Sequence, residues 1–133
     1  MAGLAYLDSS ALVKLVIAER ESPYLQVEIL ERSGLVSSWL AAAELQRAVR
    51  RTGRRALLSR VDELFGAVFF IDLTEALLMT AGELAPPELR TLDAIHVAAA
   101  LSVEDPSLDF LTYDTRQAAA ARQNGLRVLS PGR

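Results

Sequence analysis

Four acidic residues lie where a carboxylate can do chemistry. Asp8 directly follows the apolar run 4–7, and Asp114 follows a second apolar run with one residue between. Glu44 and Asp93 interrupt segments that are otherwise apolar and have helical length. Burying a carboxylate is costly unless it is paired or binds a metal ion, so Glu44 and Asp93 in particular need a partner.

Four carboxylates in one pocket would repel each other strongly, and a divalent cation is the simplest compensation. The chain has no cysteine, so the ligands would all be oxygen atoms, which favours Mg²⁺ or Mn²⁺ over zinc or copper. A hard cation held by carboxylates and water suits the cleavage of phosphodiester bonds. The acids alone therefore predict divalent-metal phosphate chemistry.

Each acid also has a structural interpretation. Asp8 and Asp114 stand where helices are expected to begin, and an acid there caps free N–H groups and complements the helix dipole. Asp93 could pair with Arg90 or act as a first-turn charge of its own helix. These alternatives stay open at the level of sequence.

Short apolar runs alternate along the chain with longer segments of helical pattern. The predicted strands are about 4–7, 35–37, 68–71, 110–112 and 128–129, and the predicted helices are about 11–18, 22–34, 39–52, 56–65, 74–84, 91–103 and 114–124. Strands that are always separated by a helix imply a parallel sheet covered on both faces.

We therefore expect an α/β fold: a three-layer α/β/α sandwich with a mostly parallel five-stranded sheet, built as a single domain over residues 1–133. In such sheets the ligand site lies at the carboxyl ends of the strands. All four acids are expected at or near that edge, each close to the start of a helix.

Composition limits the choice of partners. The formal net charge is −3, so the protein as a whole does not attract a polyanion. A local basic cluster exists, in which Arg47, Arg50 and Arg51 follow Glu44 by one or two helical turns and could hold RNA phosphates; the alternative is a solvated helix face. No apolar run is long enough to cross a bilayer and no signal peptide is visible, so we expect a cytoplasmic protein with no membrane contact.

Four short motifs resemble the signature of the PIN-domain family in order, spacing and flanks. They are Leu-Asp-Ser-Ser-Ala-Leu-Val-Lys at 7–14, Ala-Glu-Leu at 43–45, Leu-Asp-Ala-Ile-His-Val-Ala-Ala-Ala at 92–100 and Leu-Thr-Tyr-Asp at 111–114. The resemblance runs from about residue 4 to residue 131. Within the family, the sequence is most similar to VapC-type toxins of toxin–antitoxin pairs.

The resemblance implies a Mg²⁺- or Mn²⁺-dependent endoribonuclease that cleaves RNA phosphodiester bonds. In register with the family, Asp8 and Asp93 would be direct metal ligands. Glu44 would complete or orient the site, and Asp114 would act through water or a second metal ion.

Two further positions would support the site by the same resemblance, namely Ser9 after the first acid and Thr112 in the fourth strand. Some relatives carry another acid just beyond the fourth, where this chain has Thr115 and Arg116. This departure leaves open whether one or two metal ions are held.

The resemblance also implies protein partners: a second copy in a homodimer, and a small antitoxin of VapB type that places an arginine or a blocking segment in the acidic pocket. Bidentate pairing between guanidinium and carboxylate makes such blocking physically reasonable. A surface of Tyr24, Leu25, Val27, Ile29 and Leu30 could form part of the antitoxin groove, or the same residues could be core.

Two further side chains have both a functional and a structural interpretation. His96, the only histidine, follows Asp93 by one turn and could act in catalysis, although a packed histidine at the sheet edge is favoured. Trp39 opens the helix of Glu44 and could stack on a base, although a packing role is favoured.

Two alternatives to a nuclease remain. The first is a phosphoryl-transfer domain of haloacid-dehalogenase or receiver type; the former expects a second acid where Ser10 stands, and the latter could use Asp72. The second is a PIN-fold module that binds nucleic acid without cleaving it or acting as a toxin.

Overall fold

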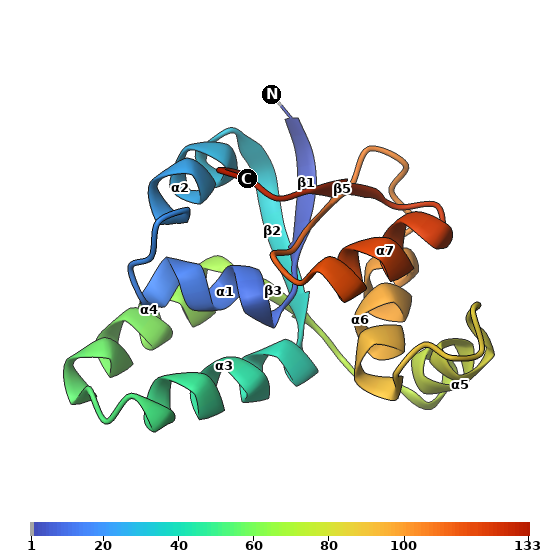
Figure 1. Ribbon diagram of the computed structural model, residues 1–133, viewed down its shortest axis with the longest axis horizontal. Helices are drawn as coiled ribbons and strands as arrows, with labels where there is room; N and C mark the ends of the chain where they lie inside the picture. Colours follow the sequence, from blue (N-terminus) through green and yellow to red (C-terminus); the bar gives the residue numbers. More distant parts are fainter. Residues whose placement is uncertain (1) are drawn as a thin grey trace.

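The structure is a computed structural model that describes residues 2–133. Its centre is one five-stranded sheet with the order β3-β2-β1-β4-β5, and each of the four neighbouring pairs is parallel. The strands are β1 (Ala2–Leu7), β2 (Arg32–Ser38), β3 (Phe69–Ile71), β4 (Asp109–Leu111) and β5 (Arg127–Leu129) (Figure 1). The parallel five-stranded sheet expected from the sequence is confirmed.

Seven α-helices and one short 3-10 helix are found in the described part of the chain. They are α1 (Ser9–Val16), α2 (Ser22–Leu30), α3 (Trp39–Arg51), η1 (Arg55–Leu57), α4 (Leu58–Ala67), α5 (Glu75–Glu83), α6 (Thr91–Ser102) and α7 (Thr115–Gln123). The longest, α3, has 13 residues. Within residues 2–133 no helix is both long and apolar enough to cross a bilayer.

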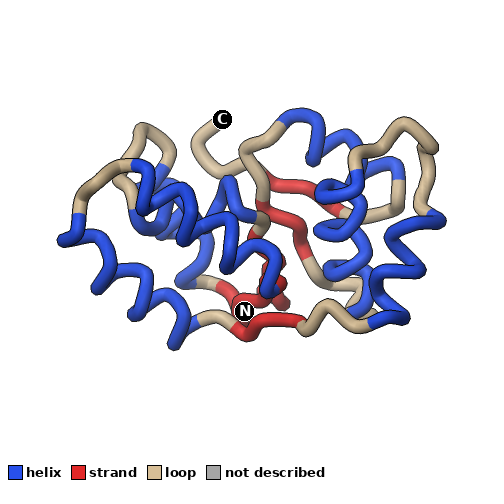
Figure 2. Tube along the Cα trace, turned by 90° about the horizontal axis from the view of Figure 1, so that it is seen from below, coloured by secondary structure: helices blue, strands red, loops and turns tan. Residues whose placement is uncertain are grey.

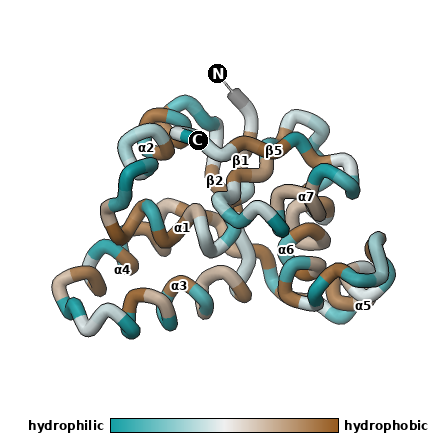
Figure 3. The backbone as a smooth tube through the Cα atoms, viewed as in Figure 1, coloured by the Kyte–Doolittle hydropathy of each residue, from teal (hydrophilic) through white to brown (hydrophobic). Residues whose placement is uncertain are grey.

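Helices cover both faces of the sheet, which gives the expected three layers (Figure 2). Successive residues of β1 point to opposite faces: Ala5 and Leu7 pack with α1 to α4, whereas Tyr6 packs with α5 to α7. The exposed helices are amphipathic, and brown and teal segments alternate along α3 and α4 in Figure 3.

The helix starts depend on short polar side chains, as expected from the sequence. Ser38 accepts a hydrogen bond from the backbone N–H of Ala41 at the start of α3, and Thr74 does the same for Leu77 at the start of α5. Gly53, just after α3, has a φ of 69°, a conformation that other residues rarely adopt.

The two largest differences from the predicted element bounds lie between α2 and β2. The second helix ends at Leu30 instead of near Gly34, and β2 begins at Arg32 instead of Leu35. The reason is long-range pairing: Arg32 lies opposite Ala2 in the β1–β2 ladder, and its guanidinium forms an ion pair with Asp109 at 2.6 Å. Neither contact can be inferred from the local sequence pattern, because both partners lie far away along the chain.

Candidate metal and RNA site

The site lies at the edge of the sheet where the connections that follow β1 and β4 run in opposite directions. From β1 the chain passes to β2 on one side, and β4 lies on the other side of β1, so the carboxyl ends of β1 and β4 form the switch point at which α/β sheets bind ligands. The register pairs Leu7 with Leu111, so the next residues, Asp8 and Thr112, are neighbours. The backbone N–H of Asp8 also donates to the carbonyl of Leu111 at 3.2 Å.

Asp8 is held by three donors and is only 3% exposed. Its Oδ1 accepts from the hydroxyl of Ser10 at 2.6 Å and from the backbone N–H of Ala11 at 3.1 Å, and its Oδ2 accepts from the hydroxyl of Thr112. Asp8 therefore caps α1, as the structural interpretation required. The cap and the site use the same carboxylate.

The two hydroxyl groups are themselves fixed from the β4–α7 turn. Ser10 Oγ accepts the backbone N–H of Tyr113 at 2.8 Å, and Thr112 Oγ1 accepts that of Asp114 at 3.1 Å. Each hydroxyl has one hydrogen, and both hydrogens are directed at Asp8. The carboxylate is thereby oriented before any ligand arrives.

Asp8 has no cationic partner: no arginine or lysine in the described part of the chain forms an ion pair with it. Burial raises the pKa of its carboxyl group, while the nearby His96 ring and the hydrogen bonds from Ser10 and Thr112 oppose the rise. The ionised carboxylate is thus oriented but not neutralised. A bound cation would supply the missing charge.

Asp93 lies in the first turn of α6 and is half-buried. Among residues 2–133 its carboxylate forms no hydrogen bond or ion pair; the alternative partner, Arg90, is not paired with it. Only its backbone carbonyl is used, and it accepts the side-chain amide of Gln117 at 3.0 Å. Burial, and then the negative charge of Asp114, raise the pKa of Asp93.

Asp114 is exposed and caps α7. Its Oδ1 accepts the backbone N–H groups of Arg116 at 2.9 Å and Gln117 at 3.1 Å. The capping role considered from the sequence is therefore present. It uses one carboxylate oxygen, and Oδ2 is left for another ligand.

Glu44 points from α3 into an open groove between α1 and α3. The groove has a volume of about 410 Å³ and is lined by Ser9, Ser10, Val13, Ala43, Glu44, Arg47, Ala48 and Arg51. Glu44 Oε1 also lies 2.8 Å from His96 Nε2. One groove thus holds an acid and two arginines.

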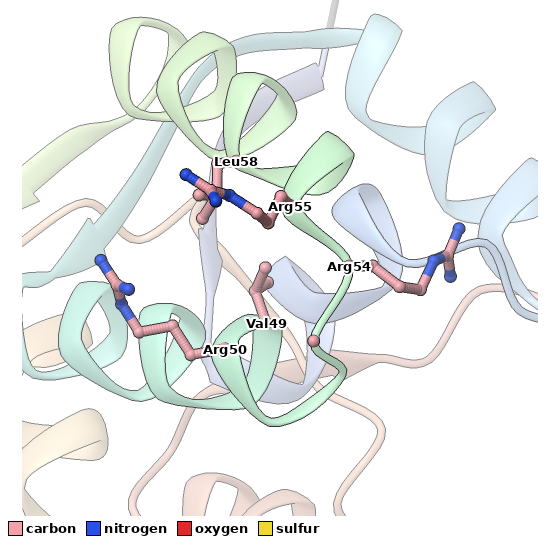
Figure 4. Close-up of a pocket in the computed structure, with 6 residues that line it drawn as sticks. Val49, Arg50, Arg54, Arg55 and Leu58 are labelled. Atoms are coloured by element: carbon pink, nitrogen blue, oxygen red, sulfur yellow. The ribbon is translucent and has the colours of Figure 1, made fainter.

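The third arginine of the predicted cluster lies elsewhere. Arg50 borders a separate cavity of about 120 Å³, together with Val49, Gly53, Arg54, Arg55 and Leu58. In Figure 4, Arg50 and Arg55 extend to one side of this cavity and Arg54 extends to the other. Arg47 and Arg51 line the same groove as Glu44, whereas Arg50 does not.

Two side chains have more direct contacts than the sequence suggested. Ser10 donates to Asp8, a contact that was not predicted from the sequence, and both Ser9 and Ser10 line the groove. His96 is packed and buried, as favoured from the sequence, but its partners are Tyr6 and Glu44. The serine could have been found from its spacing, since a residue two positions after an N-cap lies beside the cap.

The described residues do not form a complete cage. Within residues 2–133, no three His, Cys, Asp or Glu side chains lie close enough together to hold a metal ion. Mg²⁺, however, keeps several waters and needs only one or two carboxylates from a protein. The donor set, all oxygen and without a paired cation at Asp8 and Asp93, fits such an ion.

The receiver-like alternative is not supported by the position of Asp72. This residue follows β3, an edge strand separated from β1 by β2, and it is exposed. It is therefore remote from the switch point at which Asp8 and Thr112 meet.

Comparison with known proteins identifies the family to which the chain belongs. The family model described as the PIN domain matches residues 5–123. The chain belongs to the PIN-domain family. Ribonuclease VapC46 of Mycobacterium tuberculosis is 42% identical over 137 residues, covering 95% of this chain and 96% of that protein.

Solved PIN-domain structures have the same fold. VapC20 of M. tuberculosis, a toxin that cleaves the sarcin–ricin loop, aligns with a TM-score of 0.73 and 18% identity, covering 96% of this chain and 99% of that one. A chain of a toxin–antitoxin complex from Klebsiella pneumoniae aligns with a TM-score of 0.72 and 19% identity, covering 96% and 97%. The resemblance to VapC proteins expected from the four motifs is confirmed.

Proposed function

We propose that this protein is a Mg²⁺- or Mn²⁺-dependent endoribonuclease and the toxin of a VapBC-type pair. One observation carries the proposal: the buried carboxylate of Asp8 lies at the switch point, and neither it nor the carboxylate of Asp93, near Asp114, forms an ion pair within residues 2–133. The name of the relative VapC46, a ribonuclease, supports RNA as the substrate.

In this proposal each acid has a separate task. Asp8 and Asp93 hold the metal ion, and the hydroxyls of Ser10 and Thr112 keep Asp8 in place. Glu44 would complete or orient the site, and Asp114 would act through water or a second metal ion. A bound ion would supply an activated water and positive charge for the scissile phosphate and the leaving oxygen.

The groove between α1 and α3 gives the RNA a path to the acids. Arg47 and Arg51 line it together with Glu44 and can neutralise phosphates that flank the cleaved bond. Arg50 is left out of this role because it borders another cavity. The local pair of arginines compensates for the acidic net charge of the whole protein.

Protein partners are part of the proposal. In the helix expected to contribute to an antitoxin groove, Tyr24, Val27 and Leu30 are 60%, 61% and 83% exposed, whereas Leu25 is fully buried. We assign the three exposed residues, and not Leu25, to contact with a small VapB-like antitoxin. A homodimer and a cytoplasmic location complete the proposal.

Cleavage of RNA tests the proposed function. Purified protein is mixed with a single-stranded RNA in Mg²⁺, in Mn²⁺ and in EDTA, and Asp93→Asn is compared with Asp72→Asn, which alters an exposed acid outside the site. We expect metal-dependent cleavage by the wild type and by Asp72→Asn but not by Asp93→Asn. RNA binding without cleavage would support the binding-module alternative, and cleavage by Asp93→Asn would contradict the proposed site.

A further inference from the structure

The single histidine joins three elements of the site. His96 lies on α6, one turn after Asp93, and is 3% exposed. Its Nδ1 lies 3.0 Å from the hydroxyl of Tyr6 on β1, and its Nε2 lies 2.8 Å from Oε1 of Glu44 on α3. Both ring nitrogens are therefore occupied, and each has one protein partner.

Tyr6 decides how the imidazole is oriented. The tyrosine is fully buried, and its ring stacks on Phe110 with centroids 5.1 Å apart and planes 13° apart. The phenol hydroxyl carries one hydrogen, which it can donate to Nδ1 of His96. In a neutral imidazole only one nitrogen carries a hydrogen, and a donor at Nδ1 places that hydrogen on Nε2.

The hydrogen on Nε2 is directed at Glu44. A glutamate on a helix surface has three flexible torsions, and its side chain is 31% exposed here. The imidazole limits this freedom by binding Oε1, while Glu44 still lines the groove between α1 and α3. The chain Tyr6–His96–Glu44 thus has the form of the outer-shell hydrogen bonds that orient ligands at metal sites.

We propose that His96 is a positioning residue, which Tyr6 directs and which fixes the carboxylate of Glu44 at the acidic end of the groove. The effect of His96 on RNA cleavage rests on the proposed function, whereas its hydrogen bonds with Tyr6 and Glu44 do not. The hydrogen bonds themselves exist without metal or RNA and can be measured in the metal-free protein.

The first arm of the test therefore uses the metal-free protein. Because the chain has one histidine, ¹⁵N-labelled imidazole gives a single pair of ring signals. We expect a hydrogen on Nε2 in the wild type, slowed in its exchange with water, and faster exchange in Tyr6→Phe and in Glu44→Ala. A hydrogen on Nδ1 alone, or ring signals unchanged in both variants, would overturn the proposal.

The second arm measures cleavage with His96→Leu, which removes the donor, and His96→Gln, which keeps one. Loss of an outer-shell partner lowers activity about 10- to 100-fold. We expect such a loss in kcat for His96→Leu with little change in KM for RNA, and partial recovery in His96→Gln. Thermal unfolding verifies that both variants fold.

The outcomes separate this proposal from the proposed function. Wild-type kcat in folded His96→Leu, or equal losses in folded His96→Leu and His96→Gln, would overturn the role of His96 in positioning. If the wild type cleaves no RNA, the proposed function fails, and the imidazole signals still decide whether Tyr6 and Glu44 hold the ring.

Discussion

The hydroxyl of Thr112 donates to the carboxylate of Asp8 and accepts the backbone N–H of Asp114, so one side chain connects the first and fourth acids of the site. This contact follows from the pairing of Leu7 with Leu111. It explains why a threonine, and not an apolar residue, follows the buried strand β4.

Substitution of Thr112 can remove its hydroxyl group while keeping the volume of its side chain. Thr112→Val keeps the volume but leaves Oδ2 of Asp8 without its donor and the Asp114 N–H without an acceptor, at a cost of about 1–3 kcal/mol in unfolding free energy. Losing the donor also raises the pKa of Asp8 further, so protons compete better with Mg²⁺. We expect the pH–rate profile of cleavage to move to higher pH at fixed Mg²⁺, and Thr112→Ser to remain near the wild type. An unshifted profile in Thr112→Val would remove Thr112 from the site.

Because Arg47 and Arg51 line the groove and Arg50 does not, we expect their substitutions to affect RNA binding differently. Arg47→Ala combined with Arg51→Ala should weaken binding and lower the slope of log K against log salt by about 0.7 for each lost phosphate contact. The matched control, Arg50→Ala, should keep the wild-type slope because it lies outside the groove. Binding isotherms at several salt concentrations provide the measurement, and equal slopes for all variants would contradict the path along α1 and α3.

A buried ion cluster near the C-terminus predicts a dependence of stability on pH. The Arg133 guanidinium and then the Lys14 ammonium hold the pKa of Glu21 at about 2, below its ordinary 4.5. A lowered pKa in the folded state stabilises the protein above about pH 4.5, and this contribution is lost as the pH falls toward 2. Glu21→Gln should therefore be less stable than the wild type at pH 7, and the difference should shrink in acid.

Urea unfolding between pH 7 and pH 2 measures this convergence. Glu19→Gln is the control, because the Glu19 side chain is exposed and, among residues 2–133, it pairs only with Lys14, at 3.3 Å. An ion pair with one partner exposed to solvent contributes little to stability. A constant difference between Glu21→Gln and the wild type at every pH would show that packing, and not charge, is lost.

The fold was predictable because local and periodic signals agreed along most of the chain. Apolar runs marked the strands, and Ser38, Thr74, Gly53 and Gly125 marked helix ends by the chemistry of their own side chains or backbones. The start of β2 was not predictable, because Arg32 joins the sheet through partners far away in the sequence.

The candidate site was predictable to a similar extent. The types and positions of the four acids indicated the edge of the sheet, but their partners depend on packing. His96 reaches Glu44 only once α3 and α6 are assembled, whereas Ser10 contacts Asp8 locally, two residues along the chain. The separation of Arg50 from Arg47 depends on how α3 packs between α1 and α4, which helical spacing alone does not give.

We propose that the carboxylate of Asp93 is kept for a cation and not for a protein partner. Because burial and Asp114 raise its pKa, the ionised Asp93 lowers the stability of the metal-free fold at neutral pH. Mg²⁺ bound only to the folded state would add about 2.7 kcal/mol at 100 times its Kd.

Thermal unfolding of the wild type and Asp93→Asn, each with EDTA and with Mg²⁺, measures whether Asp93 holds a cation. We expect the metal-free variant to melt above the metal-free wild type, and Mg²⁺ to raise the Tm of the wild type but not that of the variant. A metal-free Asp93→Asn that melts clearly below the wild type, or one that Mg²⁺ stabilises equally, would contradict this proposal.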